Sequence, residues 1–409
     1  MTAFVAPNTI KLLLGDARVK QVSDDFYVEQ SAPTPPTWNP IPGDIESGWN
    51  QVAVKAKTYD TNTNTLRKIY IIDGGVALHA DLPTMTRLNV ACSGGANCPT
   101  TSYPLVGCYG HATHVAGIVG AIANTGNGVK GIYAGFPNMV SLSVSERSST
   151  NTADCGDVIA ASGVANSLDY VYWDAGQNNP YKIAHIATMS INTGGTQYVN
   201  EGSPGANWNR VKTVATSIWA NGVPLIPGVF FVQSSGNVNP VSSQKDACFR
   251  AYRPDFGLPA AVEDGVMVVG AVHHNGHAVV LSETFSGTYP SSPPIAGSEY
   301  YSTGGSCVDV WAPGNLISSL WGEHAAGNDH FTVWPTQYTG VLLSGNQGWA
   351  FLSGTSMAAP HVAAAAAWLA DSEGLTTSGA IEAAVRANSY QFNGNKDSFG
   401  LPVNMIQLP

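Results

Sequence analysis

The stretch Ser353–Val362 reads SGTSMAAPHV and continues into five alanines, Ala363–Ala367. Small and apolar residues at this density predict a helix packed closely on all sides, in which Pro360 is tolerated because it falls in the first turn. Ser356 then lies at the amino end of that helix. The helix dipole and the N–H groups there favour developing negative charge, which makes Ser356 a candidate nucleophile or a helix cap.

Two other segments place a polar residue at the end of an apolar strand or at the start of an apolar helix. Lys68–Asp73 is an apolar strand-like run that closes on Asp73, after which two glycines allow a sharp turn. Gly110–Gly117 reads GHATHVAG and leads into a small-residue helix, with His111 at its start and His114 one turn on. A buried carboxylate at Asp73 can orient a histidine. Taken alone, each segment fits a structural role at least as well: Asp73 as a turn cap and the histidines as core packing.

Apolar strand-like runs alternate with helical patterns along the chain. The runs are mostly continuous, which is typical of a parallel sheet buried on both faces. We therefore expect an α/β fold of three layers, with a mostly parallel central sheet flanked by helices, and a site at the carboxyl ends of the strands. The predicted strands are Lys68–Asp73, Met139–Val144, Ile183–Ile191, Gly228–Ser234, Val266–Val272 and Val308–Trp311.

Helical spacing marks three segments between or after these strands. Apolar residues repeat at helical intervals from Val211 to Trp219, and Gly222 is a stop signal. Ala153–Trp173 shows a weaker version of the same pattern. Near the C-terminus, Thr376–Ser378 offers N-caps for a helix.

Taken in chain order, the segments around Asp73, His111 and Ser356 resemble the catalytic motifs of the subtilisin-like serine proteases, or subtilases, of the subtilisin and proteinase K type. Ser234–Asn237 reads SSGN and resembles the segment with the family's oxyanion asparagine. Met189–Ile191 resembles the strand that pairs with the bound substrate backbone. The resemblance implies the subtilisin-like fold.

The resemblance also implies a role for each site residue. Ser356 attacks the scissile carbonyl after His111 takes its proton, while Asp73 orients His111 and stabilises its protonated form. Asn237 and the Ser356 backbone N–H stabilise the oxyanion, with Thr355 as a helper. The expected activity is that of a secreted serine endopeptidase acting on protein or peptide substrates.

Substrate contacts are expected from Ser190, Ile191, Ser234, Ser235, Gly236 and Thr355. The segments that resemble the pocket walls, Ser190–Gly195 and Gln233–Gly236, carry no charge. An uncharged pocket favours an apolar or aromatic residue before the cleaved bond, the P1 residue. His114 and His361 match positions that the family uses for packing, so we do not expect them in the site.

Two positions depart from the family pattern. Gly74 stands where Ser or Thr usually follows the catalytic Asp, so a hydroxyl that could hydrogen-bond the carboxylate is missing. Ala112 stands where a glycine usually follows the catalytic His. Neither change removes a proton carrier or the nucleophile, so we expect a working enzyme. The alternative within the fold is a catalytically impaired homologue that binds peptides in the same cleft.

An esterase of the α/β-hydrolase type is the alternative enzyme class. That fold needs the motif Gly-x-Ser-x-Gly and the chain order Ser, Asp, His. Here Ala358 replaces the last glycine and Ser356 comes last, so this class is disfavoured.

Composition suits a protein outside the cell. Charged residues make up 11%, less than half of the usual share of about 25%. With 28 acidic and 18 basic residues the net charge is −10, which argues against a nucleic-acid partner. No apolar run reaches the roughly 18–20 residues that span a bilayer, so we expect no membrane partner. We also expect the protein to be a monomer. Met1–Leu14 lacks the pattern of a secretory signal. The six cysteines allow three disulfides, whose pairing stays open.

The first thirty residues carry a separate resemblance. Asp16–Glu29 resembles the last strand and tail of the inhibitory propeptide that precedes many subtilase domains, and a Pro-rich break, Ser31–Pro36, follows it. We therefore expect residues 1–32 to be a propeptide remnant, or a plain N-terminal extension, and residues 33–409 to be the catalytic domain. The propeptide would act as the enzyme's own inhibitor, with self-cleavage near Ser31–Pro33.

No cofactor is required for this chemistry, but calcium is a common structural ion in the family. Asp81 and the loop Asn124–Val129 fall near one family calcium site, although Thr125 stands where an amide ligand is expected. Between Asn315 and Ser353 the chain is also longer than the family usually needs. This insertion predicts either a flap over the leaving-group side or a loop that packs on the domain.

Overall fold

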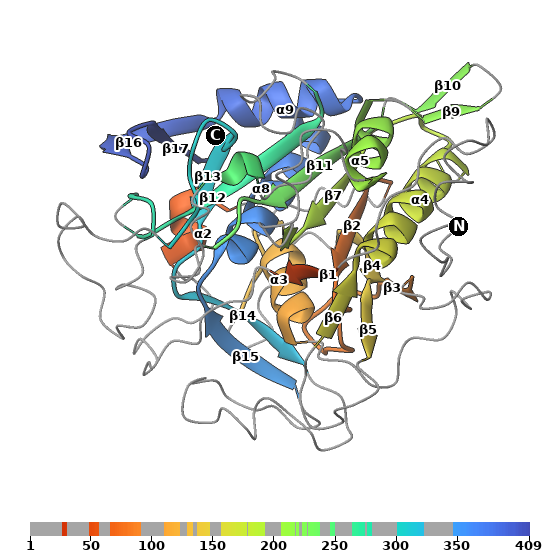
Figure 1. Cartoon of the computed structure of the whole chain (residues 1–409), viewed down its shortest axis with the longest axis horizontal. Coiled ribbons are helices and arrows are strands. Elements are labelled where there is room, and N and C mark those ends of the chain that lie inside the picture. Colours follow the sequence, from red (N-terminus) through yellow and green to blue (C-terminus); the bar gives the residue numbers. More distant parts are fainter. Residues whose placement is uncertain are drawn as a thin grey trace, which may run out of the picture.

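A sheet of nine strands forms the centre of the molecule, in the order β16-β17-β13-β12-β11-β7-β2-β4-β3 (Figure 1). Neighbouring strands from β17 to β3 are parallel, whereas the edge strand β16 runs antiparallel to β17. The mostly parallel α/β sheet expected from the sequence is confirmed. In chain order its strands are β2 (Lys68–Asp73), β3 (Thr86–Asn89), β4 (Asn138–Ser143), β7 (His185–Met189), β11 (Val229–Ser234), β12 (Val266–Val272), β13 (Val310–Pro313), β16 (Ser389–Lys396) and β17 (Pro402–Ile406).

The structure is a computed structural model. It describes residues 27–30, 49–56, 66–90, 110–122, 129–133, 137–147, 157–177, 179–192, 206–216, 218–220, 223–226, 228–237, 246–249, 264–274, 276–279, 301–322 and 347–409.

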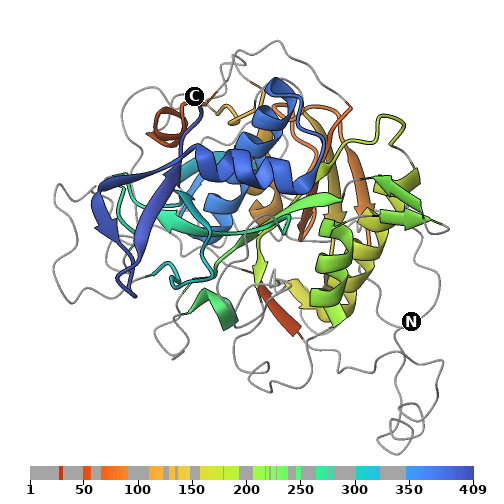
Figure 2. The same ribbon diagram turned by 90° about the horizontal axis from the view of Figure 1, so that it is seen from above.

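Helices cover both faces of the sheet (Figure 2). Along β2, Ile69 and Ile71 belong to one core with α3, α8 and α9, whereas Tyr70 and Ile72 belong to a second core with α4 and α5. Because successive side chains of a strand point to opposite faces, this split means that both faces are buried and the fold has three layers. The helices are α2 (Trp49–Val54), α3 (Gly110–Gly120), α4 (Ala161–Gln177), α5 (Ala206–Thr216), α8 (Thr355–Ser372) and α9 (Ser378–Ala387). Among the described helices, none is long and apolar enough to cross a membrane.

Some helix and strand ends predicted from the sequence match the structure, and others do not. The bounds of β2 and β12 match the predicted strands, and Thr377 caps α9 by accepting from the Ala380 N–H at 3.2 Å. The helix predicted as far as Trp219 is wrong at its end. α5 stops at Thr216, and Ile218–Ala220 forms β9, antiparallel to β10 (Val223–Ile226). Ile218 is β-branched and Trp219 is aromatic, and both residue types favour strands, which explains why this segment forms a strand and not the end of the helix.

Smaller elements surround this core. β1 (Tyr27–Gln30), β5 (Ser145–Arg147), β6 (Asp157–Ala160) and β8 (Ile191–Asn192) form a four-stranded sheet in the order β5-β6-β1-β8. Within the segment Ala153–Trp173, which the sequence predicts as a helix, residues 157–160 form β6 and α4 begins only at Ala161. β14 (Ile317–Gly322) and β15 (Gln347–Leu352) form an antiparallel pair, and the short 3₁₀ helix η1 spans Ala247–Phe249.

One disulfide, Cys248–Cys307, joins η1 to the segment before β13. The other four cysteines, Cys92, Cys98, Cys108 and Cys155, lie outside the described residues, so their pairing stays a prediction.

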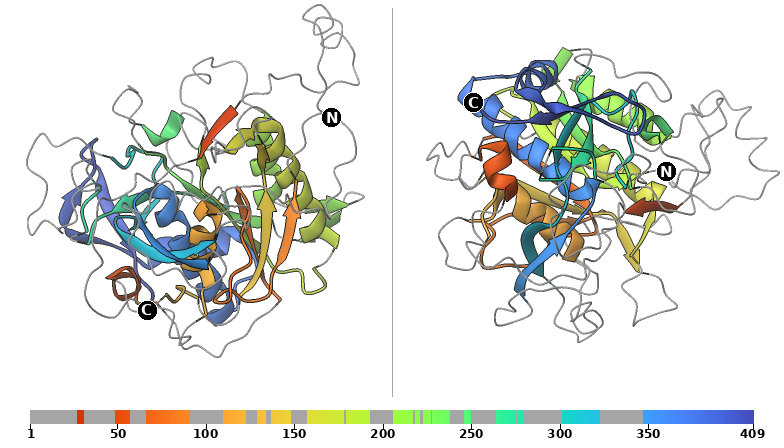
Figure 3. Two further views of the ribbon diagram at one scale, coloured as in Figure 1. Left: turned by 90° about the horizontal axis from the view of Figure 1, so that it is seen from below. Right: turned by 90° about the vertical axis from the view of Figure 1, so that its left-hand side faces the viewer.

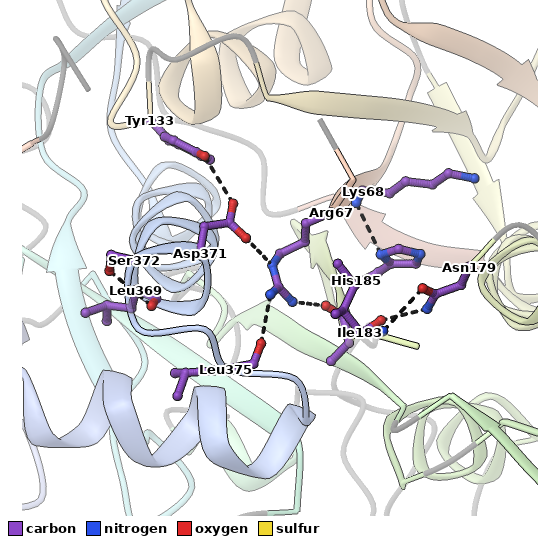
Figure 4. Close-up of polar contacts among 11 residues, drawn as sticks. Arg67, Lys68, Tyr133, Asn179, Ile183, His185, Leu369, Asp371, Ser372 and Leu375 are labelled. Atoms are coloured by element: carbon purple, nitrogen blue, oxygen red, sulfur yellow. Dashed lines mark hydrogen bonds and ion pairs between the residues drawn. The ribbon is translucent and has the colours of Figure 1, made fainter. Parts of the chain in front are cut away.

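A buried arginine ties the amino end of β2 to the carboxyl end of α8 (Figure 4). The Arg67 Nε donates to Asp371 Oδ1 at 2.8 Å, and its two other guanidinium nitrogens donate to the carbonyls of Leu375 and Ala184. Tyr133 donates its hydroxyl to the second oxygen of Asp371 at 3.1 Å. Both charged side chains are almost fully buried. Hydrogen bonds from each of the three guanidinium nitrogens and to both carboxylate oxygens offset the free-energy cost of burying the two charges.

Candidate active site

The residues singled out in the sequence gather at one edge of the sheet. Asp73 is the last residue of β2, Ser190 directly follows β7, and Ser234 ends β11. These three strands are parallel neighbours, in the order β11-β7-β2. Parallel neighbours end at the same edge, so separated segments of sequence meet there.

The carboxylate and the first histidine are in direct contact. α3 begins at Gly110, which places His111 in its first turn. His111 Nδ1 lies 2.9 Å from Asp73 Oδ1, and the same oxygen accepts the Gly74 N–H at 2.7 Å. With Nδ1 donating to the carboxylate, Nε2 is the ring nitrogen left to take a proton. Asp73 Oδ2 is buried and has no hydrogen-bond partner within the described part of the chain.

Ser356 is the second residue of α8, at the helix N-terminus where the sequence predicts it, and it is fully buried. Pro360 is the sixth residue of α8, so the prediction that it falls in the first turn is wrong. The Ser190 hydroxyl donates to the main-chain carbonyl of Ser356 at 2.9 Å, which joins the end of β7 to the start of α8.

Asn237 is held by the residue before Ser356. Its Oδ1 accepts the Thr355 N–H at 2.9 Å and the Thr355 hydroxyl at 3.0 Å, and that hydroxyl accepts the Gly236 N–H at 3.1 Å. Because two donors point at this end of the amide, it must be the oxygen Oδ1, and the nitrogen Nδ2 is turned away from Thr355. A Cβ at Gly354 would lie 3.0 Å from Nδ2, which is a tight contact, so the glycine leaves room for the amide.

The predicted substrate-contact residues lie together, but several of their hydroxyls bind within the protein. Ser234 Oγ donates to Asn192 Oδ1 at 3.1 Å, and Asn192 Nδ2 donates back to the Ser234 carbonyl at 2.6 Å. Ser235 Oγ donates to the Thr303 carbonyl at 3.1 Å. Gly236 accepts the Thr303 hydroxyl at 2.9 Å through its carbonyl oxygen. Contact between these residues and a substrate stays a prediction.

The backbone of β8 is paired with the chain's own N-terminal strand. β1 lies between β6 and β8 (Figure 3), with Glu29 opposite Asn192 and Gln30 opposite Ile191 in antiparallel register. The rest of the segment Asp16–Glu29 that resembles a propeptide, up to residue 26, lies outside the described residues.

The two other motif histidines pack inside the protein. His114 is fully buried and its Nε2 lies 3.0 Å from the carbonyls of both Ile317 and Ala350, while burial lowers its pKa to about 3. His361 donates from Nδ1 to the Met357 carbonyl at 2.7 Å, and burial lowers its pKa to about 4. Both are neutral near pH 7 and act as packing and hydrogen-bonding residues.

The described parts of the segment from Asn315 to Ser353, for which the sequence left open a flap over the leaving-group side or a loop packed on the domain, form a hairpin. β14 lies along α3 (Figure 1), and a Cβ at Gly110 would lie 2.2 Å from the Trp321 ring. Trp321 therefore contacts the residue immediately before His111. The insertion's residues 323–346 lie outside the described part, so a flap stays a prediction. The sequence shows a glycine before His111 and a tryptophan far along the chain, but local patterns cannot predict that these two residues are in contact.

The calcium hypothesis also stays a prediction. Asp81 is buried, its N–H donates to His79 Nδ1 at 3.1 Å, and its carbonyl accepts the Ile122 N–H at 2.8 Å. The loop Asn124–Val129 is described only at Val129. Within the described ranges, no group of three or more His, Cys, Asp or Glu side chains is arranged to hold a metal ion.

Comparisons with a family model and with known proteins point to the same family. The family model described as the subtilase family matches residues 67–401. A subtilisin-like serine protease from Rhodotorula mucilaginosa is 24% identical over 352 residues, covering 86% of this chain and 76% of the relative. An alkaline serine exoprotease A from Vibrio alginolyticus is 29% identical over 260 residues, covering 64% of this chain and 31% of the relative.

Solved structures agree at the level of the fold. A protease structure from Pseudoalteromonas arctica superimposes with a TM-score of 0.55 at 20% identity, covering 88% of this chain and 92% of that one. Because the family model spans most of the chain and its relatives are serine proteases, the chain belongs to the subtilase family and is a serine endopeptidase.

Proposed function

We propose that this endopeptidase is secreted and hydrolyses peptide bonds through Asp73, His111 and Ser356, with Asn237 in the oxyanion hole. The observation that carries the proposal is the 2.9 Å contact between His111 Nδ1 and Asp73 Oδ1. This contact orients the imidazole so that Nε2 can act as the base toward a serine at the start of α8.

The proposed reaction has two steps. His111 Nε2 takes the Ser356 hydroxyl proton as Oγ bonds to the scissile carbonyl carbon, and the oxyanion is stabilised by Asn237 Nδ2 and the Ser356 N–H. His111 then gives the proton to the leaving amine as the C–N bond breaks. Water, deprotonated by His111, hydrolyses the acyl-enzyme and returns Ser356 to its starting state.

We propose that substrates bind as an added β-strand on β8. Extended peptides gain main-chain hydrogen bonds by pairing with an exposed strand, and β1 already pairs with β8 in antiparallel register. The N-terminal segment therefore takes the place of a substrate strand, which supports its role as an inhibitory propeptide remnant. Its position suggests self-cleavage just after Gln30, near Ser31–Pro33.

An apolar or aromatic P1 residue is the proposed preference. The described wall segments, Ser190–Asn192 and Gln233–Gly236, contain no charged side chain that would pair with Lys, Arg, Asp or Glu. Cleavage-site mapping of a peptide library by mass spectrometry tests this preference. A dominant charged P1 residue would contradict it.

The test of the function is casein cleavage by the wild type and by Ser356→Ala, each with and without a serine-directed covalent inhibitor. Loss of cleavage in the variant and in the inhibited wild type supports the proposed nucleophile. Intact-mass analysis of the same preparation shows whether the N-terminus is removed near Gln30. An active preparation with an unchanged N-terminus would contradict the propeptide assignment.

A peptide-binding role without catalysis is the second candidate. The buried Asp73 Oδ2, which has no hydrogen-bond partner, is the observation that favours it. A folded, processed protein that leaves casein intact but binds unfolded peptides would replace the protease proposal with this one.

A further inference from the structure

We propose that Ser190 is a positioning residue for the nucleophile, because its hydroxyl replaces a hydrogen bond that Pro360 removes from helix α8. This inference rests on the proposed function, in which Ser356 attacks the substrate.

The gap in the helix follows from the sequence. In an α-helix the carbonyl of residue i accepts the N–H of residue i+4. For Ser356 that donor would be residue 360, and Pro360 has no N–H. The first turn of α8, which carries the nucleophile, thus lacks one of its regular backbone hydrogen bonds.

Ser190 supplies a donor at that carbonyl. Its Oγ donates to the Ser356 carbonyl at 2.9 Å, although the two residues are 166 positions apart. Ser190 is 1% exposed and Ser356 is fully buried. A buried carbonyl without a donor costs free energy, so the contact stabilises the Ser356 peptide group in one orientation.

The contact links the nucleophile to the centre of the sheet. Ser190 follows β7, and β7 pairs with β2, which ends on Asp73, and with β11, which leads to Asn237. β7, which leads to Ser190, therefore lies between β2, which ends on Asp73, and β11, which leads to Asn237. Its hydroxyl fixes Ser356 relative to both.

The position of Ser190 also explains why a side chain expected to face substrate is turned inward. The main chain next to it, at Ile191, pairs with β1. Backbone recognition of an extended peptide and side-chain support of Ser356 then come from adjacent residues of one short segment. A substrate that orders this segment also orders the nucleophile.

The experiment pairs Ser190→Ala with Pro360→Ala. Ser190→Ala removes the donor, and we expect kcat to fall about tenfold, with KM within about twofold, because small misplacements of reacting groups lower the rate strongly. Pro360→Ala restores the helical N–H at position 360. We expect the double variant to recover most of the kcat lost in Ser190→Ala.

The matched control is Ser378→Ala. Ser378 is also buried and donates its hydroxyl to a main-chain carbonyl, that of Ala215, at 2.7 Å, but it belongs to α9. We expect it to lower the melting temperature like Ser190→Ala while leaving kcat within about twofold of wild type. A kcat for Ser190→Ala equal to that of this control would overturn the proposal.

Melting temperatures separate this proposal from the proposed function. Pro360→Ala should also restore part of the Tm lost in Ser190→Ala, and this readout needs no activity. If no casein cleavage depends on Ser356, the proposed function fails, and the Tm rescue still decides whether Ser190 replaces the missing N–H. Absence of rescue in Tm would contradict the inference even in an active enzyme.

Discussion

Asn237 Oδ1 accepts two hydrogen bonds from one residue, the N–H of Thr355 at 2.9 Å and its hydroxyl at 3.0 Å. The residue before the proposed nucleophile therefore fixes the orientation of the proposed oxyanion amide. Because Thr355 and Ser356 are consecutive, the two proposed oxyanion donors, Asn237 Nδ2 and the Ser356 N–H, are positioned by one short segment.

Thr355→Val removes one of these two tethers without changing side-chain shape. The amide then retains the Thr355 N–H, and we expect kcat to fall about tenfold, less than the roughly 10²–10³-fold loss typical when an oxyanion donor is deleted, as in Asn237→Ala. Steady-state kinetics of both single variants and the double variant check this. If Thr355 acts through Asn237, the double variant is no slower than Asn237→Ala alone.

Gly74→Ser is expected to raise activity. Asp73 Oδ2 is buried without a partner, and a hydroxyl at position 74 can donate to the carboxylate. Gly75 takes the left-handed φ of 109°, but Gly74 does not take a positive φ, so a side chain at 74 adds no backbone strain. We expect kcat/KM to rise about two- to tenfold, which is about 0.4–1.4 kcal/mol. This is less than the roughly 1.5–3 kcal/mol that a hydrogen bond to a charged group contributes to stability, because only its effect on the transition state changes the rate. Gly74→Ala, which adds bulk without a donor, is the control and should show no gain.

Gly110→Ala tests the contact between the hairpin and the histidine. The new Cβ would lie 2.2 Å from the Trp321 ring, so either the ring or the first turn of α3 must move. Because Trp321 is buried, we expect part of the shift to fall on α3 and on His111. We expect a loss of kcat of about 10²-fold, because a shift of about 1 Å is sufficient for that. Adding Trp321→Leu to Gly110→Ala makes room and should return part of the rate. A double variant as slow as Gly110→Ala would show that the loss has another origin.

Asp371→Ala is expected to destabilise the fold without touching the site. It leaves the Arg67 guanidinium buried at 3% side-chain exposure without its carboxylate, and breaking a buried pair costs about 3–5 kcal/mol. The control is Asp169→Ala, which breaks an exposed pair with Arg210 and should cost about 0–1 kcal/mol. Urea unfolding measures both. Similar losses in the two variants would contradict the assigned role of Arg67.

Stability should fall as the pH drops below about 6.5. Burial lowers the pKa of His361 to about 4, whereas in the unfolded chain it is about 6.5. As the pH falls, His361 is therefore protonated in the unfolded chain at a higher pH than in the folded chain. Its contribution to the free energy of unfolding falls between about pH 6.5 and pH 4 and stays constant below about pH 4. From pH 7 to pH 5 we expect this residue to account for about 2 kcal/mol.

Urea unfolding at pH 7 and pH 5 checks this prediction. His361→Gln cannot take up the proton, so its loss of stability over this pH range should be smaller than that of the wild type by about 2 kcal/mol. Equal pH dependence in the two proteins would mean that His361 does not contribute.

Local sequence was a good guide where one segment acts by itself. β2 and β12 are continuous apolar runs, and they fold as strands with the predicted bounds because both faces of the sheet are buried. Ser356 lies at the start of a helix, as the small residues after it indicate. The contact between His111 and Asp73 was expected from the resemblance of their motifs, and their atoms lie 2.9 Å apart.

Residue types, their order along the chain and the buried strands were thus readable from the sequence by itself, since hydrophobic periodicity and turn chemistry are local. Tertiary structure alone decided which distant atoms meet: Ser190 at the Ser356 carbonyl, Trp321 against Gly110, and Arg67 with Asp371. The end of α5 and the place of Pro360 in α8 were decided there too. The physical reason is that hydrogen bonds and packing between residues far apart in the chain exist only once the sheet and the helices on its faces have assembled and brought those residues together.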